Sequence, residues 1–419
     1  MIGLREVRRK GLALAGDRRF LLCVYVGMTL IGSIQKYWAG EIGTFLNLTT
    51  AANKLIEGQD LYKPRYDVYH YTPTFAFFMI PLSHLPTWLS LTLWNLLNAM
   101  SLFYAITRLG IPDRKRALIC WIILWELLTA IQNYQSNALI AALFLWTFVL
   151  LERGSSFWAA FCTMASAFIK VFGVAGALLL PFYPHKKRAV GHLLLWLGVL
   201  VLLPCLVVSP GHLVELYRTW IDQLQVVHGV FYGMSVMGIL HSWFGVSLPN
   251  AWVQFAGSAA VCCPLLRRGQ YRSPAFRTLF LGSLTIWAVL FNHKAESPAY
   301  VIAMLGVALW FVAQERAGLD RFLLALALLA SFQPEFVPRD LRENYVTPYS
   351  LKAVPFVLIW LKLQYELLWT DYRGAEPTAG QLSENSANDE RRAQGPSLPI
   401  SSTRLRIDGL LRRQYSASS

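Results

Sequence analysis

The sequence predicts an all-α protein, a polytopic transmembrane helical bundle of about twelve spans with short juxtamembrane helices in its first external loop. Hydrophobic residues make up 55% of the 419 residues and charged residues 15%, whereas a soluble domain carries about 25% charged residues. Long apolar segments also recur along the chain with short basic clusters between them, which is the pattern of positive cytoplasmic loops. A large soluble helical protein would show neither feature.

The positive charge indicates cytoplasmic loops and not a nucleic-acid partner. The net charge is +14, but the basic residues lie in separate clusters at 5–19, 108–116, 185–188 and 267–272, each between apolar segments. The six cysteines all lie in apolar segments, without the spacing of a metal site or a disulfide framework. The histidines are scattered as well, so we expect neither a metal nor a cofactor.

The N-terminal region begins the bundle. Residues 1–19 are a basic cytoplasmic segment, and no small-residue cleavage site follows, so 20–38 is interpreted as an uncleaved span that leaves the cytoplasm. The first external loop then covers 39–88, and the periodicity of 44–56 within it is compatible with a helix.

A short apolar segment in this loop decides the topology. Residues 73–85 reach only about half the ~20 residues that cross a bilayer, and Pro73 and Pro81 interrupt them, so we expect a helix at the membrane face. If 73–85 crossed, the span 89–107 would carry the basic cluster 108–116 to the outside. If 73–85 stay at the membrane surface, that cluster lies in the cytoplasm, which agrees with the rule that cytoplasmic loops are enriched in Lys and Arg.

The next apolar segments alternate in direction. Residues 117–131 run outward, the polar turn 132–137 lies outside, and 138–151 return. Residues 157–183 are too long for one untilted span and contain Lys170, which at mid-bilayer would cost about 2.5–3.5 kcal/mol. Two short spans that meet outside at Lys170 avoid this cost.

The same alternation continues to the end of the transmembrane domain, which we expect at 20–369. The remaining predicted spans are 190–208, 253–266, 278–291, 300–311, 323–332 and 354–368. External loops are expected at 209–249, with an amphipathic segment at 213–227, and at 333–352. Residues 370–419 are rich in Ser, Gly, Pro and charge and are predicted to be a disordered cytoplasmic tail.

This topology collects polar residues at the external face, where ionisable groups meet a dry boundary. A carboxylate there can act as a general base towards a sugar hydroxyl, and the candidates are Asp67 and Glu41. Cationic groups can neutralise a phosphate leaving group, and the candidates are Lys170, His293 and Lys294. The expected substrate-binding residues are Tyr69, His70, Gln135, Asn137 and Glu296.

Structural roles remain open for several of these residues. Asp67 is also consistent with a loop residue that binds the backbone, and Glu41 with an interfacial charge at a helix end. Lys170 is also consistent with a structural lysine whose side chain extends to the membrane–water interface. Glu126 lies inside a predicted span, and we expect it to form a hydrogen bond between helices.

Several short motifs resemble glycosyltransferase family 87. GQDLY at 58–62 and YHYTPTFAFFMIPLSHLP at 69–86 are similar to its G-x-x-L-Y … Y-x-P-x-F … P-L-x-x-L-P pattern. Tyr-Gln-Ser-Asn at 134–137 resembles its G-Q-x-N turn, with Tyr134 in place of the glycine. Residues 165–170 are similar to its helix of small residues that ends in a lysine.

The resemblance implies a C-type membrane glycosyltransferase at the outer face of the cytoplasmic (inner) membrane. Such an enzyme transfers a sugar, often mannose, from a polyprenyl-phosphate donor to a lipid or glycan acceptor, with inversion. The superfamily usually carries its catalytic acid soon after the first span. Here the spacing to Gly58 places Thr44 at that position, which leaves Glu41 and Asp67 as the favoured acids. The donor-phosphate lysine of the superfamily corresponds to Lys170.

Two other functions remain open at this point. A lipid flippase or transporter would need broken or charged helices at mid-membrane and internal repeats, and the sequence shows no repeat. A family member that has lost catalysis is the other alternative, because of Thr44. The expected partners are therefore a polyprenyl-phosphate sugar, an acceptor and membrane lipids.

Overall fold

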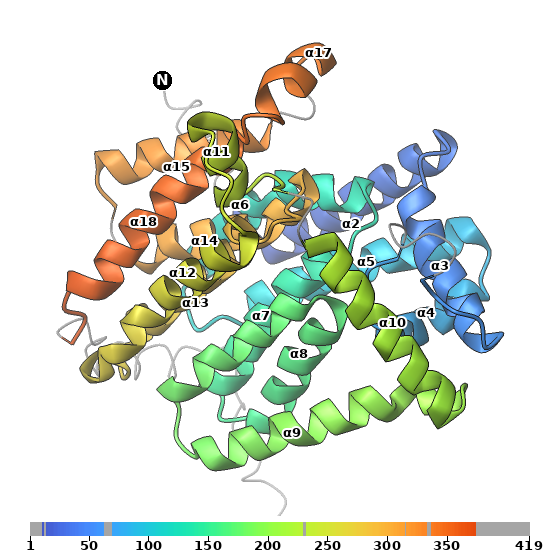
Figure 1. Cartoon of the computed structure of the whole chain (residues 1–419). Helices are drawn as coiled ribbons and strands as arrows, with labels where there is room; N and C mark the ends of the chain where they lie inside the picture. The colour runs from blue at the N-terminus through green and yellow to red at the C-terminus, as the bar shows by residue number, and fades with distance from the viewer. Residues whose placement is uncertain are drawn as a thin grey trace, which may run out of the picture. The chain divides into compact units, whose positions relative to one another are not determined.

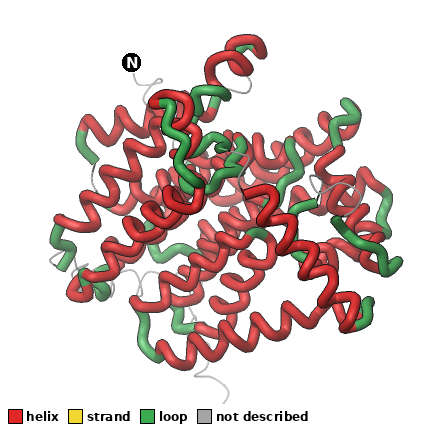
Figure 2. The backbone as a smooth tube through the Cα atoms, viewed as in Figure 1, coloured by secondary structure: helices red, strands yellow, loops and turns green. Residues whose placement is uncertain are grey.

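The computed structural model of the chain describes residue 11 and residues 14–62, 69–228, 232–314, 316–332 and 337–373 (Figure 1). Within these ranges every regular element is a helix and no strand occurs, which confirms the all-α prediction (Figure 2). The described residues belong to one compact unit that ends at Arg373.

The N-terminal helices have nearly the expected bounds. Helix α2 (Arg18–Trp38) starts after Asp17, whose side chain accepts hydrogen bonds from two backbone N–H groups of the first turn. Helix α3 (Gly43–Ile56) and the short helix α4 (Pro73–Ser83) pack against each other. Thr72 caps α4 by accepting a hydrogen bond from the backbone N–H of Phe75. The short helix predicted at 73–85 is therefore confirmed as a helix.

Three longer helices follow; the first two pack against α2 and the third packs against the first of them. They are α5 (Thr87–Thr107), α6 (Asp113–Gln132) and α7 (Asn137–Glu152). Polar contacts link them: Asn95 Nδ2 of α5 donates to Ser33 Oγ of α2 at 2.9 Å, and Tyr25 OH donates to the Cys120 carbonyl oxygen at 2.8 Å. Such buried hydrogen bonds between helices set their register.

The interruption expected at Lys170 is present. Helix α8 (Ser156–Ile169) ends there, Lys170 itself has extended backbone, and the 3₁₀ helix η1 (Val171–Phe182) continues. Helix α8 runs between α7 and α9 (Lys186–Leu202), and the turn η2 (Leu203–Leu206) extends α9 (Figure 1).

The C-terminal half adds the remaining helices. In chain order they are α10 (Pro210–His228), α11 (Val236–Phe244), α12 (Asn250–Cys262), η3 (Cys263–Leu266), η4 (Arg268–Gln270), α13 (Pro274–Leu290), η5 (Ser297–Ala299), α14 (Tyr300–Ala313), α15 (Gly318–Ser331), α17 (Arg339–Leu341), the π-helical turn η6 (Arg342–Val346) and α18 (Ala353–Trp369). Helix α11 was not among the predicted helices, because the amphipathic segment 213–227 was the only helix expected in that loop.

Helices α13 and α14 cross very closely at a pair of glycines. A Cβ atom placed on Gly306 would lie 2.4 Å from the carbonyl oxygen of Gly282. No larger residue fits this position without separating the helices, so glycine permits the crossing.

A buried ion pair joins α6 to the start of α18. Lys352 Nζ lies 2.9 Å from Glu126 Oε1, and both side chains are almost fully buried. Lys352 also donates to Ser297 Oγ at 2.8 Å and lies over the Tyr300 ring. The expectation that Glu126 bonds to another element is therefore confirmed, with Lys352 as a partner.

Three helical segments are long and apolar enough to cross a membrane: Arg18–Trp38, Thr87–Thr107 and Lys186–Leu206. The other apolar helices, such as Asn137–Glu152 and Pro274–Leu290, have 10–17 residues, fewer than the ~20 of an untilted span. The membrane character of the chain is supported by these segments, while the count of about twelve spans stays a prediction.

Candidate functional site

A series of hydrogen bonds joins Lys170 to two segments far away in the sequence. The Lys170 ammonium donates to Asn137 Oδ1 at 2.8 Å, and Asn137 Nδ2 donates to Gln135 Oε1 at 2.5 Å. Gln135 Nε2 in turn donates to Glu296 Oε2 at 2.8 Å. We call these four residues the Lys170 chain. All four were predicted as site residues, and the structure brings them together.

Each member is positioned by the end of a helix. Lys170 lies between α8 and η1 and belongs to neither, and its backbone N–H donates to the Ser166 carbonyl oxygen at 2.9 Å. Asn137 is the first residue of α7 and is buried. Glu296 directly precedes η5 and is exposed. Helix ends therefore hold the polar groups, while the helices supply the apolar packing.

The turn before Asn137 has an unusual backbone. Tyr134 has φ +52°, in the left-handed region that favours glycine. Its carbonyl oxygen accepts a hydrogen bond from Trp94 Nε1 at 2.9 Å, and its ring is buried beside Phe45. These contacts compensate the conformational cost of about 1–2 kcal/mol for a residue with a side chain. A tyrosine therefore occupies a position where a glycine would adopt the conformation more readily.

Burial and two neighbouring charged groups shift the pKa of Lys170. Burial lowers the pKa of the Lys170 ammonium to about 8, while Glu296 opposes this shift and Lys294 adds to it. A lysine with this pKa is still mostly protonated at neutral pH. The electrostatic influence of Lys294 also indicates that the two cations lie in the same neighbourhood.

Lys294 contacts the segment before α4 through His70. Lys294 Nζ lies 3.2 Å from His70 Nε2, and His70 Nδ1 lies 3.0 Å from Gln223 Nε2 of α10. Gln223 Nε2 donates to the Tyr69 carbonyl oxygen at 2.8 Å. The predicted residues Lys294, His70 and Tyr69 are therefore neighbours, although 224 positions separate His70 from Lys294.

Two further predicted residues, Tyr69 and His293, form hydrogen-bond contacts with neighbouring protein groups. The Tyr69 side chain is buried, and its hydroxyl donates to the Thr72 carbonyl oxygen at 3.2 Å. His293 Nδ1 lies 3.2 Å from Gln254 Nε2 of α12. Both residues therefore border the polar region, and their roles towards a substrate stay predictions.

A cavity of about 350 Å³ lies beside the end of the Lys170 chain. Its lining residues are Tyr232, Gly233, Met234, Gly238, His241, Ala295, Glu296, Ser297, Thr347, Pro348 and Ser350. The Tyr232 and His241 rings stack at 4.3 Å between centroids. We call it the Glu296 cavity, because Glu296 both lines it and ends the Lys170 chain. Its volume is within the range of about 300–1,000 Å³ that is usual for ligand sites.

Most of this lining was not anticipated from the sequence. Tyr232 and His241 lie in the 209–249 loop and Thr347 in the 333–352 loop, and neither loop carries a recognisable motif. The only available signal was indirect: both loops were expected at the same external face as Glu296.

Gly233 packs tightly against the loop that carries His293, Lys294 and Glu296. Its φ is +55°, and a Cβ atom there would lie 2.7 Å from the His293 carbonyl oxygen. Met234 N–H donates to the Ala295 carbonyl oxygen at 2.7 Å, which anchors the contact. The position of the 293–296 loop therefore depends on the segment at Gly233 and Met234.

We expect Gly233→Ala to displace this loop and to lower both the unfolding temperature and any activity of the site. The left-handed backbone alone costs about 1–2 kcal/mol, and the clash adds to it. Gly245→Ala is the matched control, because Gly245 has φ +64° but open space around it. Thermal unfolding and ligand binding of both variants check this. Equal effects of the two substitutions would contradict the role given to the contact.

The two candidate acids differ in what the structure describes. Asp67 lies outside the described residues. Glu41 is exposed and forms an ion pair with Lys36, whose hydrogen bond lowers the pKa of the Glu41 carboxyl. Burial raises the pKa of Tyr134 to about 12, and Glu41 adds to this shift. Glu41 therefore lies near the turn that leads into Gln135 and Asn137. Thr44 is exposed near the start of α3.

The comparison with protein families supplies the identity that geometry alone leaves open. Residues 69–292, more than half of the chain, match Glycosyltransferase family 87. The chain belongs to glycosyltransferase family 87. No curated protein matches the chain.

Membership of glycosyltransferase family 87 implies a membrane glycosyltransferase, with a sugar donor and an acceptor as substrates. The matched region includes the predicted site residues Tyr69, His70, Gln135, Asn137 and Lys170. The loop with Lys294 and Glu296 lies just beyond it, yet its side chains contact residues within it. Among the described residues, no group of three or more His, Cys, Asp or Glu side chains is arranged to hold a metal ion.

Proposed function

We propose that the protein transfers a sugar from a polyprenyl-phosphate donor to a lipid or glycan acceptor, with inversion, at the outer face of the cytoplasmic (inner) membrane. The sugar is mannose or another hexose or pentose. The observation that carries this proposal is the Lys170 chain, which joins a half-buried lysine to polar groups that open onto a cavity of about 350 Å³. A site of this kind offers a cation for a phosphate and hydrogen-bonding groups for a sugar.

The cations stabilise the leaving group. As the bond between the anomeric carbon and the phosphate oxygen breaks, negative charge accumulates on the lipid phosphate. Lys170 and Lys294 provide positive charge in the same neighbourhood, and His293 lies on the loop that carries Lys294. Fixed charges of this kind favour the transition state, because they need no rearrangement as the charge develops.

A carboxylate of the first external loop accepts the proton of the acceptor. Asp67 or Glu41 removes it from an acceptor hydroxyl, whose oxygen attacks the anomeric carbon from the side opposite the phosphate. One carbon–oxygen bond forms, the bond to the phosphate breaks, and the configuration inverts. Gln135, Asn137, Glu296, His70 and Tyr69 form the sugar-binding side in this proposal.

The topology of about twelve spans is part of the proposal. It has both termini in the cytoplasm, a transmembrane domain at 20–369, and external loops at 39–88, 209–249 and 333–352. Residues 374–419 of the predicted tail lie outside the described residues. Two observations support the alternation of directions, namely the short helix α4 and the break of the chain at Lys170. Three helical segments are of spanning length. Lys170, Glu296 and His70 then share the external face.

The test is transfer of radiolabelled mannose from polyprenyl-phosphate mannose by the purified full-length protein. We expect the double substitution of Asp67→Asn with Glu41→Gln to lower the turnover by about 10²- to 10⁴-fold, the usual contribution of a general base. The two single variants then identify the base.

The matched control is Glu57→Gln, which removes another acid of the same loop. Glu57 accepts a hydrogen bond from Gln59, and we expect its loss to leave turnover unchanged. Full turnover in the double variant would remove both acids from the mechanism. Donor binding without turnover in the wild type would instead indicate a family member without catalysis, as Thr44 suggests. Vectorial lipid movement without transfer would indicate a flippase.

A further inference from the structure

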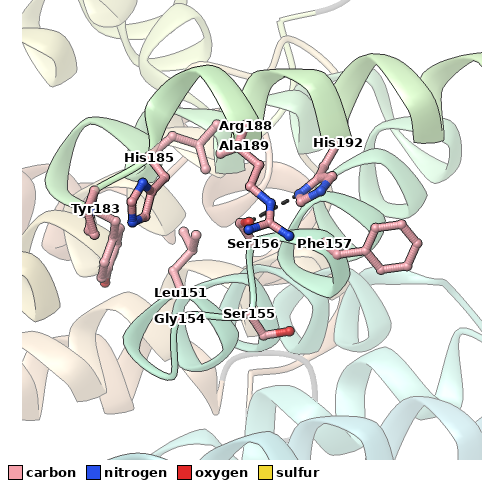
Figure 3. Close-up of a pocket in the computed structure, with 12 residues that line it drawn as sticks. Leu151, Gly154, Ser155, Ser156, Phe157, Tyr183, His185, Arg188, Ala189 and His192 are labelled. Atoms are coloured by element: carbon pink, nitrogen blue, oxygen red, sulfur yellow. Dashed lines mark hydrogen bonds between the residues drawn. The ribbon is translucent and has the colours of Figure 1, made fainter.

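A second cavity lies at the opposite end of α8 from Lys170. It has a volume of about 310 Å³, and α7, α8, η1 and α9 all contribute to its lining (Figure 3). The lining residues are Leu151, Gly154, Ser155, Ser156, Phe157, Leu180, Tyr183, Pro184, His185, Arg188, Ala189 and His192. We call it the α8–α9 cavity. Helix α8 has 14 residues, so its two ends are about 21 Å apart at 1.5 Å per residue.

The polar lining of this cavity is basic. Arg188 and His192 point from α9 towards Ser156 at the start of α8, and His185 faces the same space (Figure 3). The Ser156 hydroxyl lies 3.1 Å from His192 Nδ1. Within the described part of the chain, no hydrogen bond or ion pair holds the Arg188 guanidinium. The cavity thus presents a guanidinium, two imidazoles and hydroxyl groups, which suit a phosphate.

None of the described residues that line the cavity carries a carboxylate to balance this charge. The acid nearest in sequence to the lining residues is Glu152, which borders the lining through Tyr183 and forms an ion pair with Arg277. Arg277 donates to Glu152 from Nε at 2.6 Å and from Nη2 at 3.0 Å, and the Tyr183 hydroxyl also donates to it, at 2.5 Å. The positive charge of the α8–α9 cavity therefore remains available to a ligand.

The helix that leads away from the cavity suits acyl chains. Helix α9 starts with three basic residues, and the segment Lys186–Leu206 is the least buried of the three candidate spans, at 17%. Its exposed apolar side chains include Val190, Leu194, Leu195, Leu197, Val199 and Leu202. A charged headgroup in the cavity would therefore have its hydrocarbon chains beside an apolar helix surface. Basic pockets between membrane helices bind anionic lipids in this way.

We propose that the α8–α9 cavity binds the phosphodiester headgroup of an anionic phospholipid, whose acyl chains lie along α9. A soluble phosphate shares the headgroup chemistry, but it would make no use of the exposed apolar surface of α9. This lipid site is separate from the site of sugar transfer, because the α8–α9 cavity shares no lining residue with the Glu296 cavity or the Lys170 chain. It does not depend on the proposed catalytic function.

The experiment is native mass spectrometry of the full-length protein in a non-ionic detergent, with phosphatidylglycerol added stepwise. Phosphatidylcholine is the neutral-headgroup comparison, and inorganic phosphate is the soluble probe. We expect tighter binding of phosphatidylglycerol than of phosphatidylcholine. We expect Arg188→Gln to weaken phosphatidylglycerol binding about tenfold or more, the effect of losing a charged hydrogen bond.

Lys187→Gln is the matched control. It removes the same charge from the neighbouring position of α9, yet Lys187 does not line the cavity, so we expect little change. The double variant of His185→Gln with His192→Gln should also weaken binding, and unchanged unfolding temperatures establish that the variants are folded.

Three outcomes would overturn the proposal. Equal losses of phosphatidylglycerol binding in Arg188→Gln and Lys187→Gln would show that binding depends on the overall surface charge and not on the cavity. Equal binding of phosphatidylcholine would remove the role of the anionic headgroup. Binding of inorganic phosphate that depends on Arg188, without selective lipid binding, would assign the cavity to a soluble phosphate compound.

Discussion

Lys170→Met should lower the rate of sugar transfer by about 10²- to 10³-fold, the usual effect of removing one group that stabilises developing charge. Methionine keeps most of the length of the side chain but removes its charge and its hydrogen bond to Asn137 Oδ1. The loss should appear mainly in kcat, because the phosphate gains its charge as the bond to the sugar breaks. Single-turnover measurements with a radiolabelled polyprenyl-phosphate donor check this.

The control for this prediction is Lys115→Met, which removes an exposed lysine at the start of α6, the end of that helix away from Gln135. A second readout comes from pH. Burial lowers the pKa of Lys170 to about 8, and a lysine loses its charge as the pH rises through its pKa. Transfer by the wild type should therefore decline between about pH 7 and pH 9, whereas Lys170→Arg should flatten this decline because a guanidinium stays protonated. If Lys170→Met kept more than about a tenth of the wild-type transfer rate, Lys170 would not be the group that stabilises the leaving phosphate.

Lys352→Met should destabilise the fold by about 3–5 kcal/mol, because it leaves the Glu126 carboxylate buried without its cationic partner. The two side chains are 1% and 0% exposed, so water cannot replace the lost interaction. The substitution also removes the hydrogen bond to Ser297 Oγ in η5, next to Glu296. Thermal unfolding of the purified protein in detergent measures the effect.

Two further variants separate the loss of an ion pair as such from the cost of a buried, unpaired carboxylate. Arg339→Met breaks an exposed ion pair with Glu343, and exposed pairs contribute only about 0–1 kcal/mol. The double substitution of Glu126→Leu with Lys352→Met removes both buried charges and should recover much of the stability. An unchanged unfolding temperature in Lys352→Met would show that the pair does not stabilise the protein.

Much of the helical framework could be predicted from the sequence, because each long apolar segment has one stable form in a bilayer. The bounds of α5 and α7 differ from the predicted segments by one or two residues. The break after α8 was also predictable, since a lysine between two apolar segments is costly to bury. Helix α11 was missed because its nine residues lie outside 213–227, the segment of that loop that was expected to be helical.

The pairing of side chains could not be predicted from the sequence. Gln135 and Glu296 are 161 positions apart, and Glu126 and Lys352 are 226 apart. Topology could place Gln135 and Glu296 at one face, but their contact depends on how the helices pack. The contribution of Tyr232, His241 and Thr347 to the Glu296 cavity could not be predicted either, because it also depends on how the helices pack.

The glycine crossing of α13 and α14 restricts the loop between these helices. A Cβ atom on Gly306 would lie 2.4 Å from the Gly282 carbonyl oxygen, and the loop that joins the two helices carries His293, Lys294 and Glu296. The facing wall of the Glu296 cavity is tied to the same elements, because Met234 N–H donates to the Ala295 carbonyl oxygen at 2.7 Å and Tyr300 OH donates to the Met234 carbonyl oxygen at 2.8 Å. The width of the cavity therefore depends on how α13 and α14 pack, since both of its walls are attached to this pair of helices.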